Sequence, residues 1–493
     1  MSRLGRYSLI ALGCIACLAA LLIFWPSTRA PLPEPSQSRL ITNARVIDVV
    51  AGSAGPPVSI EIRDGKIVAI GAGLKADDLR QFDAEGAYLL PAFWDMHVHT
   101  FQSSPQMHLP LWIANGVTNV RDMMDCPKEE DSLIACAGDK RRWNAEIAEG
   151  RLSAPRFVEV ASYYLESPEI TPAEAEELVE TYSNRGLDAI KVYNRLSPGA
   201  YQAAARKALA LDVRIVGHLP KAISLDAAIE AGQKSFEHAH VLAQQCSSQA
   251  QDWRDGKLDD LSATIRLETI IAGFDTARCD DLIARLAASG AWLVPTHVTR
   301  EEDARAADPS FADDPRLEYL DPLSRFAWDD DLGGTRSAYP GQRGERALQA
   351  YFAHGLHLTG KAHAGGVNIL VGTDTALGGF RYHDELSHLV AAGMTPAEVI
   401  RAATLDAARY VGAEKTSGTV AIGKRADLVL LGGNPLDCIA NTRRIVAVVQ
   451  GGRLYDRAKL DGLLDFAKDQ AGTPHTMAKL LWAFVRSSVS SDL

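Results

Sequence analysis

Eight apolar, strand-like runs recur along the middle of the chain, each separated from the next by a stretch with helical periodicity. Eight strand–helix units within about 310 residues are typical of a parallel (β/α)8 (TIM) barrel, in which functional side chains gather at the carboxyl ends of the strands. We therefore predict an α/β fold with such a barrel at 89–410. The runs are PAFWDMHVH, GVTNVRDM, RFVEVAS, LDAIKVY, RIVGHLP, SFEHAH, AWLVPTHV and VNILVGTDT.

Short alternating strands occur on both sides of the predicted barrel. Residues 39–88 hold such strands with a turn at Asp64-Gly65, and 411–458 return to the same texture. The two parts are expected to form one small composite β-sandwich domain. The tail, 459–493, is predicted to be helical, with an apolar face that packs on the barrel. That face comprises Met477, Leu480, Leu481, Phe484 and Val485.

The first thirty residues resemble a membrane-targeting segment. Arg3 and Arg6 precede a run from Tyr7 to Thr28 that contains no charged residue. Such a run is long enough to span a bilayer, with the two arginines on the cytoplasmic side. We predict a signal anchor at 1–30, with 8–25 in the inner or plasma membrane. A cleaved signal peptide is the alternative, and 31–38 would be a stalk linker before an extracytoplasmic body that is periplasmic or at the cell surface.

Cysteine usage agrees with an oxidising compartment. Beyond the N-terminal segment there are five cysteines and no CxxC zinc spacing. Because each pair brackets one insertion, we expect Cys126 to pair with Cys136 and Cys246 with Cys279, while Cys438 stays free. The net charge of −11 makes nucleic acid an improbable partner. A small-molecule substrate is expected, and a homo-oligomer remains possible.

Two stretches exceed ordinary loop lengths, Cys246 to Cys279 and Glu301 to Asp331. The second holds 11 acidic residues against 3 basic ones. Long insertions of this kind act as lids over a barrel mouth or as solvated surface excursions, and the sequence favours neither.

Side chains that bind metals gather at the ends of the predicted strands. Strand alternation puts His97 and His99 on one face of the first strand, pointing into the barrel mouth. Lys191, on the fourth strand, also faces inward, where an unpaired lysine is costly to bury. His218, His238 and Asp374 end three further strands. Six potential ligands from five strands therefore converge on one rim.

These motifs resemble the amidohydrolase superfamily, in its imidazolonepropionase-like and prolidase-like branch. GVTNVRDM, AGQKSFEH, HDELSHLVAAGMTPAEVIRAATLDAAR and GTVAIGKRADLVLLGGNPL share the resemblance, which extends from about Arg39 to about Tyr455. The resemblance implies two divalent metal ions, expected to be Zn²⁺. In that scheme His97, His99 and Asp374 hold one ion, His218 and His238 hold the other, and a carboxylated Lys191 bridges them.

The chemistry of these ligands supports hydrolysis. Zn²⁺ takes imidazole and carboxylate ligands, and a carbamate converts a lysine into a bridging carboxylate. A water held between two ions loses its proton near neutral pH, and Asp374 can pass that proton to the leaving nitrogen. We therefore predict an amidohydrolase that cleaves an amide or peptide bond of a dipeptide or N-acyl amino acid. A lactonase or cyclic amidase would use the same site, whereas an inactive anchored binding protein would have no reason to keep Lys191.

Four side chains beyond the ligands are candidates for substrate contacts: Tyr193, His297, Arg300 and Arg381. Arg381 is the favoured anchor for a substrate carboxylate, because a guanidinium can donate two parallel hydrogen bonds. The alternative is that both arginines pair with the acidic insertion.

Other polar residues near the strand ends have supporting roles in this interpretation. His240 shares a predicted face with His238 and could replace it as a ligand. Arg121 and Asp122 are expected to form a structural pair under the site. His383 and Glu385 are expected to support the loop after the eighth strand.

Overall fold

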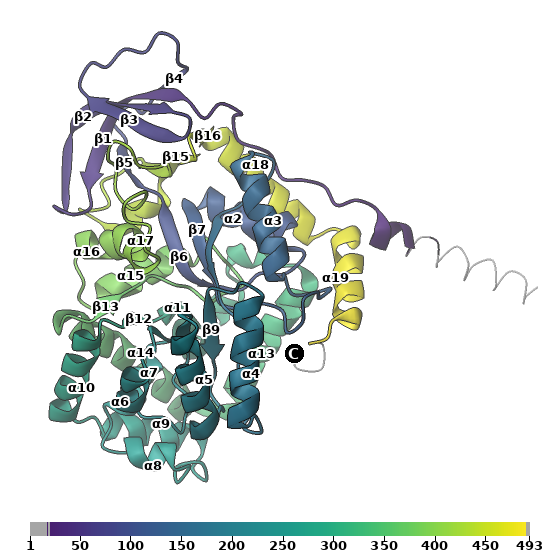
Figure 1. Cartoon of the computed structure of the whole chain (residues 1–493), viewed down its shortest axis with the longest axis vertical. Helices are drawn as coiled ribbons and strands as arrows, with labels where there is room; N and C mark the ends of the chain where they lie inside the picture. The colour runs from purple at the N-terminus through teal and green to yellow at the C-terminus, as the bar shows by residue number, and fades with distance from the viewer. Residues whose placement is uncertain (1–16, 18–19, 490–493) are drawn as a thin grey trace, which may run out of the picture.

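The computed structural model describes residue 17 and residues 20–489 (Figure 1). One eight-stranded sheet takes its strands from both ends of the chain, in the order β16-β15-β14-β5-β1-β2-β3 with β4 beside β1. It encloses its own apolar core and lies at the upper end of the molecule in Figure 1. Its strands are β1 (Arg39–Asp48), β2 (Ser53–Arg63), β3 (Lys66–Gly71), β4 (Gln81–Asp83), β5 (Tyr88–Pro91), β14 (Leu428–Leu431), β15 (Ile445–Gln450) and β16 (Arg453–Tyr455).

The turn predicted at Asp64-Gly65 joins β2 and β3, and it also brings the two parts of this sheet together. Asp64 and Gly65 have φ angles of 49° and 75°, the left-handed pair that a two-residue hairpin turn requires. A Cβ atom at Gly65 would lie 2.8 Å from the carbonyl oxygen of Gly451. Only glycine therefore allows this turn to approach the turn between β15 and β16.

Each of the eight apolar runs contains a strand, and these strands pair in parallel. The hydrogen-bonded groups are β6-β7-β8, β9-β10 and β11-β12-β13. Most of these strands are buried on both faces, which explains why they were recognisable as continuous apolar runs. The strands are β6 (Phe93–Val98), β7 (Val117–Asp122), β8 (Arg156–Val160), β9 (Ala189–Val192), β10 (Arg214–Gly217), β11 (Ser235–Glu237), β12 (Trp292–Val294) and β13 (Asn368–Ile369).

The three parallel groups do not close into a barrel through their ladders alone. Backbone hydrogen bonds outside these ladders connect the groups instead. At the three junctions, for example, the amide of Ser162 donates to Ala189 (2.8 Å), that of Lys234 to Ile215 (2.7 Å), and that of Met96 to Val371 (2.8 Å). The fold is of the predicted α/β class, with the carboxyl ends of the strands gathered on one side.

Helices follow the parallel strands and cover them on the outside (Figure 1). Thr171 and Thr395 begin two of these helices with reciprocal capping boxes to Glu174 and Glu398. The helices up to the seventh strand are α2 (His108–Ala114), α3 (Ala137–Ala148), α4 (Pro172–Asn184), α5 (Pro198–Ala210), α6 (Leu225–Glu230), α7 (His240–Gln245), α8 (Ala250–Arg254), α9 (Ala263–Ala272) and α10 (Thr276–Ser289). Those beyond it are α11 (His297–Ala304), α12 (Pro309–Ala312), α13 (Pro322–Ala338), α14 (Gly341–Ala364), α15 (Tyr382–Ala391), α16 (Pro396–Arg401), α17 (Ala407–Tyr410), α18 (Arg457–Ala471) and α19 (Pro474–Arg486).

Short 3-10 and π segments complete the chain path: η1 (Ser104–Gln106), η2 (Pro315–Tyr319), η3 (Ala402–Asp406) and η4 (Ile439–Arg443). Of these, η3 is a π-helical turn that connects α16 to α17. The two predicted insertions are largely helical rather than extended loops. The first contains α8 and α9, and the second contains α12, η2 and part of α13.

Both predicted disulfides are confirmed. Cys126 is bonded to Cys136 and Cys246 to Cys279, with Cα–Cα distances of 5.0 and 4.5 Å. Cys438 is a free thiol, as expected. The second disulfide ties the start of the first insertion to α10.

The predicted membrane span, residues 8–25, lies mostly outside the residues that the structure describes. Residues 20–24 are helical and lead into an extended segment along the body. Within residue 17 and residues 20–489, no helix combines the length and apolar character needed to cross a bilayer.

Candidate metal centre

The first strand of the parallel set and the segment after the last one are fastened together by Asp95. One oxygen of its buried carboxylate accepts hydrogen bonds from the amides of His97 (3.3 Å) and Thr373 (3.0 Å). The other accepts the hydroxyl of Thr373 at 2.7 Å. The amide of Asp374 donates to the carbonyl of His97 at 2.8 Å. These bonds fix Asp374 opposite His97 on β6 and His99 just beyond it.

His97, His99 and Asp374 form a compact group of potential metal ligands, with one ligand atom from each within 4.8 Å of the others. Oδ1 of Asp374 lies 3.2 Å from Nε2 of His99 and 3.6 Å from Nε2 of His97. Burial favours the protonated form of Asp374, but the neighbouring imidazoles, His97 first, hold its pKa well below the usual range. Asp374 is therefore a carboxylate at neutral pH.

His218 and His238 face each other across the same rim. Their Nε2 atoms are 2.9 Å apart, and Nε2 of His238 is 3.8 Å from Oδ2 of Asp374. The Nδ1 atoms are bonded to Asn194 Oδ1 (2.8 Å) and Thr296 Oγ1 (2.7 Å), which fixes both ring orientations. Burial above all holds the pKa of each ring well below its usual value. Two neutral rings with convergent nitrogens suit a cation between them.

Lys191 lies on the same rim, at the carboxyl end of β9, and its side chain is almost completely buried. No described carboxylate lies within ion-pair distance of its Nζ atom, which sits 5.8 Å from the ring centres of Tyr164 and Tyr193. Burial lowers the pKa of Lys191 to about 8. At pH 7 roughly a tenth of the amine is then neutral, far more than for an ordinary lysine, and the neutral amine is the form that reacts with carbon dioxide.

The backbone at the rim is strained where these ligands emerge. His238, Thr296 and Asp374 adopt positive φ angles of 71°, 46° and 49°. Non-glycine residues rarely adopt this conformation, and such residues cluster at functional sites. His238 directly follows β11 and Asp374 lies in the segment after β13, and this backbone conformation directs both side chains toward the rim.

The donor set fits a divalent metal centre. Nε2 of His97 is buried and has no hydrogen-bond partner among the described residues. Its Nδ1 atom is engaged by Glu237 at 3.0 Å, so Nε2 is the nitrogen that remains for a metal. Imidazole and carboxylate donors are those that Zn²⁺ prefers. A second cluster, Asp125 with Cys126 and Cys136, does not fit because both sulfurs are in a disulfide.

Glu237, which the sequence analysis did not select, connects this centre to the layer beneath it. Arg121 donates to both of its carboxylate oxygens, at 2.8 and 2.9 Å, and Ser235 donates to one at 2.7 Å. All three side chains are buried. Strand alternation in SFEHAH could have revealed Glu237, since it places Ser235 and Glu237 on one face of β11.

The predicted pair of Arg121 with Asp122 is wrong. Neighbouring residues of a strand point to opposite faces, so these side chains cannot meet. Arg121 turns inward to Glu237, whereas Asp122 lies 3.0 Å from Lys140 and accepts the hydroxyl of Thr100.

His240 was the alternative ligand to His238. The positive φ angle of His238 ends the strand, so His240 begins α7 and its ring stacks on that of His238 with centres 5.4 Å apart. Burial, with the Arg300 charge as a smaller cause, lowers the pKa of His240 to about 3. The ring lines a cavity of about 190 Å³ together with Arg300, Trp253 and Tyr351.

Two of the predicted substrate contacts lie near the ligands, in different environments. The ring of Tyr193 stacks on His218 with centres 3.9 Å apart. His297 is fully buried, and its Nε2 atom is 3.1 Å from Oγ1 of Thr359, while its Nδ1 atom has no hydrogen-bond partner among the described residues. His297 therefore belongs to the packed wall behind the rim.

The two arginines are held by the acidic insertion and its surroundings. Arg381, with only 2% of its side chain exposed, pairs with Glu301 and Asp384 at 2.8 Å each. Arg300 pairs with Asp303 at 2.7 Å but keeps 35% of its side chain exposed. Both arginines therefore pair with the acidic insertion, as the alternative interpretation expected. Arg381 has little surface left for a substrate.

His383 and Glu385, which were both predicted to support the loop after the eighth strand, bond to different segments. Nδ1 of His383 is 3.0 Å from Oγ1 of Thr442, whereas Glu385 accepts the amide of Val298 at 2.9 Å. Each therefore holds a different segment.

Comparison with known sequences identifies a family. A profile described as "Amidohydrolase family" matches residues 88–455. A deacetylase of Agrobacterium fabrum is 32% identical over 99 residues, covering 19% of this chain and 24% of that protein. An ochratoxinase of Aspergillus niger is 37% identical over 94 residues, covering 18% and 20%. Each of these matches spans about a quarter or less of the relative's length.

Solved structures match over much more of the chain. A putative prolidase from Bifidobacterium longum gives a TM-score of 0.62 at 21% identity and covers 89% of this chain and 100% of its own. A bottromycin amidohydrolase gives 0.67 at 22% identity, covering 90% and 92%. At these identities the likeness establishes the fold.

Proposed function

Because the chain belongs to the amidohydrolase family, we propose that it is a metal-dependent hydrolase of carbon–nitrogen bonds in small substrates. The observation that carries the proposal is the convergence of six side chains on one rim, with Nε2 of His97 buried and unpartnered. A binding module would have no use for Lys191 at this place.

The eight parallel strands are proposed to act as one (β/α)8 barrel. The backbone hydrogen bonds between their groups support this, since they continue the order of the strands around a ring. The ligands would then lie at the carboxyl ends of the strands, where barrel enzymes place their active sites.

In this proposal His97, His99 and Asp374 hold one divalent ion and His218 and His238 hold a second. Carboxylation of Lys191 would give a ligand that both ions share and would remove a positive charge from the rim. When bound, such ions supply Lewis-acid activation of water and of the acyl carbonyl. Zinc is the expected metal, because of the imidazole and carboxylate donors.

The protein's own side chains carry out proton transfer and hold the ligands in position. Asp374, as a carboxylate, accepts the proton of the attacking water and returns it to the leaving nitrogen. Glu237 holds His97 through Nδ1, so that Nε2 keeps its direction. Tyr193 covers His218 and screens one side of the rim from water.

The substrate proposed is an N-acyl amino acid or a dipeptide. One of the similar sequences is named an N-acetylglucosamine-6-phosphate deacetylase and another a deacetylase, which supports an acyl–nitrogen bond over a lactone. Both arginines are paired, but Arg381 is almost wholly buried whereas Arg300 keeps 35% of its side chain exposed, so Arg300 in the cavity beside His240 is the better anchor for a free carboxylate.

An extracytoplasmic location remains a proposal, supported by the two disulfides, which form in oxidising compartments. The domain limits given above are likewise proposed.

The test combines metal analysis with a substrate panel. Purified full-length protein is expected to contain about two divalent ions per chain and to hydrolyse N-acyl amino acids or dipeptides faster than the matched esters and lactones. Absence of amide hydrolysis across the panel, with metal bound, would contradict the proposal. Hydrolysis of lactones alone would assign the same centre to the alternative substrate class.

A further inference from the structure

The C-terminal helix α19 presents apolar side chains in two directions. Leu480 points into the body and is 6% exposed, and Ala483 accepts a hydrogen bond from Ser132 through its carbonyl. On the opposite side, Leu481, Trp482 and Val485 are 48%, 40% and 75% exposed. We call these three residues the α19 face. The predicted apolar face of the tail is thus only partly packed.

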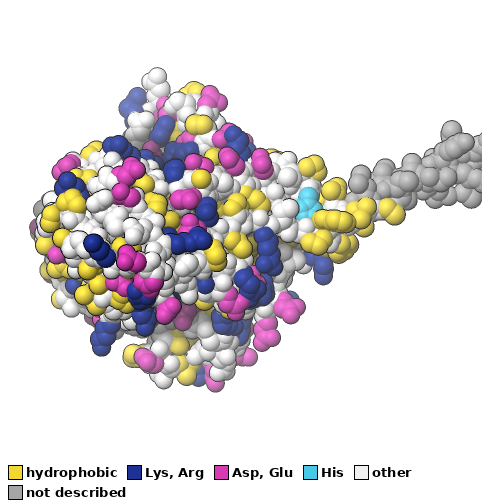
Figure 2. Space-filling model, turned by 90° about the horizontal axis from the view of Figure 1, so that it is seen from above, with side chains coloured by type: hydrophobic (Ala, Val, Ile, Leu, Met, Phe, Trp, Pro, Cys, Tyr) yellow, Lys and Arg dark blue, Asp and Glu magenta, His cyan; other side chains and the backbone are white. Residues whose placement is uncertain are grey.

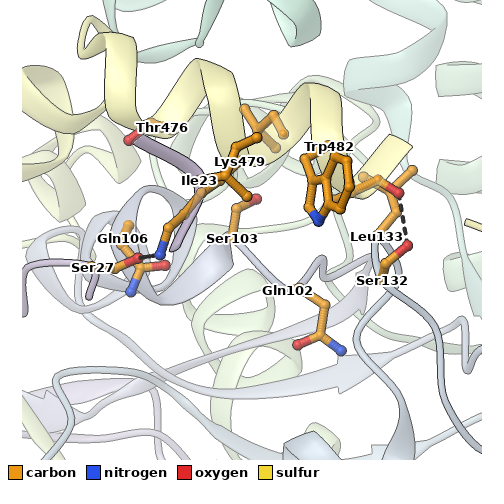
Figure 3. Close-up of a pocket in the computed structure, with 12 residues that line it drawn as sticks. Ile23, Ser27, Gln102, Ser103, Gln106, Ser132, Leu133, Thr476, Lys479 and Trp482 are labelled. Carbon is orange, nitrogen blue, oxygen red and sulfur yellow. Dashed lines mark hydrogen bonds between the residues drawn. The ribbon is translucent and has the colours of Figure 1, made fainter. Parts of the chain in front are cut away.

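The first described residues of the chain lie directly against this helix. Phe24 meets Trp482 with ring centres 6.1 Å apart, and Nζ of Lys479 donates to the hydroxyl of Ser27 at 2.7 Å. Figure 3 shows this hydrogen bond and the indole of Trp482 on the same cavity, which has a volume of about 270 Å³. We call residues 20–28 the exit segment. It runs along α19 rather than away from it.

The exit segment is also strongly apolar on its outer side. Leu21, Phe24 and Trp25 are 56%, 69% and 64% exposed. In Figure 2 hydrophobic side chains gather where the described chain begins to leave the body. Six large apolar side chains in two adjoining short segments form a contiguous patch, whereas single exposed apolar residues are common on any soluble surface.

The chemistry of this patch favours a lipid surface over another protein. The sequence that precedes the exit segment carries no charge back to Tyr7, so the patch continues directly into an apolar run. The patch contains two tryptophans and a phenylalanine, and aromatic residues are favoured at the boundary between water and hydrocarbon. Lys479 and Arg486 are the only charged residues of α19, and cations are attracted to anionic headgroups.

We propose that the α19 face and the exit segment lie together in the interfacial layer of a lipid bilayer. The helix would lie along the membrane, as amphipathic interfacial helices do, with its apolar side toward the acyl chains. Leu480 and the contacts of Ser132 hold the body against that surface. The proposal does not depend on the reaction that the metal centre catalyses.

The experiment uses the full chain in vesicles of phosphatidylcholine and phosphatidylglycerol that contain a photoactivatable phospholipid with the reactive group in its acyl chain. After illumination, adducts are mapped by mass spectrometry. We expect adducts on residues 474–486 and 20–28. The helix α5 is the internal control, because Leu209 is 79% exposed on it and lies outside the patch. Adducts on α5 at the frequency seen on α19, or none on α19, would overturn the proposal.

A charged variant separates insertion of the α19 face from mere proximity to the vesicle. Trp482→Asp combined with Val485→Asp should reduce adducts on α19 at least about fivefold, because burying charge at this depth is unfavourable. Leu209→Asp is the matched control and should change nothing. Circular dichroism and hydrolysis of the best amide substrate establish that each variant is folded.

A second copy of the chain is the competing occupant of this face. In that case α19 would gain no lipid adducts, a bifunctional cross-linker would join α19 to α19, and the double variant would convert a dimer to a monomer in detergent. That result would replace the lipid surface with a self-interface.

Discussion

The rim of the parallel strands and the layer beneath it use similar polar groups in opposite ways. On the rim, Nε2 of His97 and Nδ1 of His99 are buried without hydrogen-bond partners among the described residues, and Lys191 makes no ion pair there. Beneath it, Arg121 is matched to Glu237 by two hydrogen bonds, and Arg214 lies 2.7 Å from Glu159. Polar atoms of the rim therefore remain free to bind a ligand, whereas the charged groups of the lower layer are paired with each other.

This difference predicts which substitutions should reduce activity and which should reduce stability. Removing a rim ligand should abolish activity and metal binding with little loss of stability, because its polar contacts within the chain are few. Removing a member of the lower layer should destabilise the fold, because it leaves a charge buried without a partner. The predictions below test that separation, from the largest expected effect to the smallest.

Lys191→Ala should have the largest effect. We expect activity to fall more than about 1,000-fold, since even residues that only orient metal ligands cost about 10- to 100-fold. Metal content should fall, and short-chain carboxylic acids should restore part of the activity by replacing the carbamate. The melting temperature of the metal-free protein should not fall, because burial of an unpaired lysine is unfavourable.

Full activity of Lys191→Ala with one ion per chain would contradict the shared-ligand role. Lys140→Ala is the matched control, because Lys140 is equally buried but pairs with Asp122 in the supporting structure. It should lose stability instead of metal.

Arg121→Met should show the opposite behaviour to Lys191→Ala. It leaves the Glu237 carboxylate buried without its cation, which typically costs about 3–5 kcal/mol of unfolding free energy. Urea denaturation of both proteins measures the loss. Arg121→Met combined with Glu237→Gln should recover part of the stability, because the uncompensated charge is gone. Equal stability of Arg121→Met and the parent would show that the lower layer is not a structural support.

The gathering of these side chains on the rim was predictable because it depends on local patterns. Alternation within DMHVHT and the positions of His218, His238 and Asp374 at strand ends follow from the chain alone. The disulfides were also predictable, because each joins two cysteines at the ends of one connecting segment, with sequence separations of 10 and 33 residues. The eight parallel strands followed from the same periodicity.

The partners of the lower layer were not predictable in the same way. Arg121 lies on β7 and Glu237 on β11, in separate hydrogen-bonded groups, and only the tertiary arrangement of the strands brings them together. Proximity in sequence suggested Asp122, but the strand pleat turns it away. Likewise, the contacts of Arg381 depend on how the helical insertion folds back, which no local pattern records.

Arg300→Met tests whether Arg300 binds the carboxylate of the substrate. If Arg300 binds the substrate carboxylate, its loss removes a charge-assisted interaction of about 1.5–3 kcal/mol, so KM should rise roughly 10- to 100-fold. The kinetics of a dipeptide and of its carboxy-terminal amide provide the measurement. Only the free carboxylate should be affected. If the parent protein hydrolyses the dipeptide and its carboxy-terminal amide at the same rate, the carboxylate is not recognised.

Arg381→Met is the companion variant. Its guanidinium is paired with Glu301 and Asp384 rather than open to the site, so the variant should lose stability and leave the preference for a free carboxylate intact. A selective loss of that preference would return the anchor role to Arg381.

Glu385→Gln tests a buried carboxyl that, unlike those of the lower layer, has no cation paired with it in the part of the chain that the structure describes. Oε1 of Glu385 is buried without a hydrogen-bond partner among the described residues, and burial raises the pKa of this carboxyl to about 7. Because the folded-state pKa lies above the unfolded value of about 4.5, the folded protein holds the proton more tightly. The stabilisation is complete below about pH 4.5 and is lost as the pH rises to about 7.

The glutamine variant cannot titrate, yet its amide oxygen can still accept the amide of Val298. Its stability relative to the parent should therefore increase between about pH 4.5 and pH 7 and then level off, by about 1–3 kcal/mol. Urea denaturation at several pH values measures the difference. The same titration of Glu398→Gln is a control of opposite sign, because the hydrogen bonds from Thr395 lower the pKa of Glu398 to about 2. A difference for Glu385→Gln that is independent of pH would mean that this carboxyl is ionised in the folded protein throughout the range, and that a polar partner reaches it.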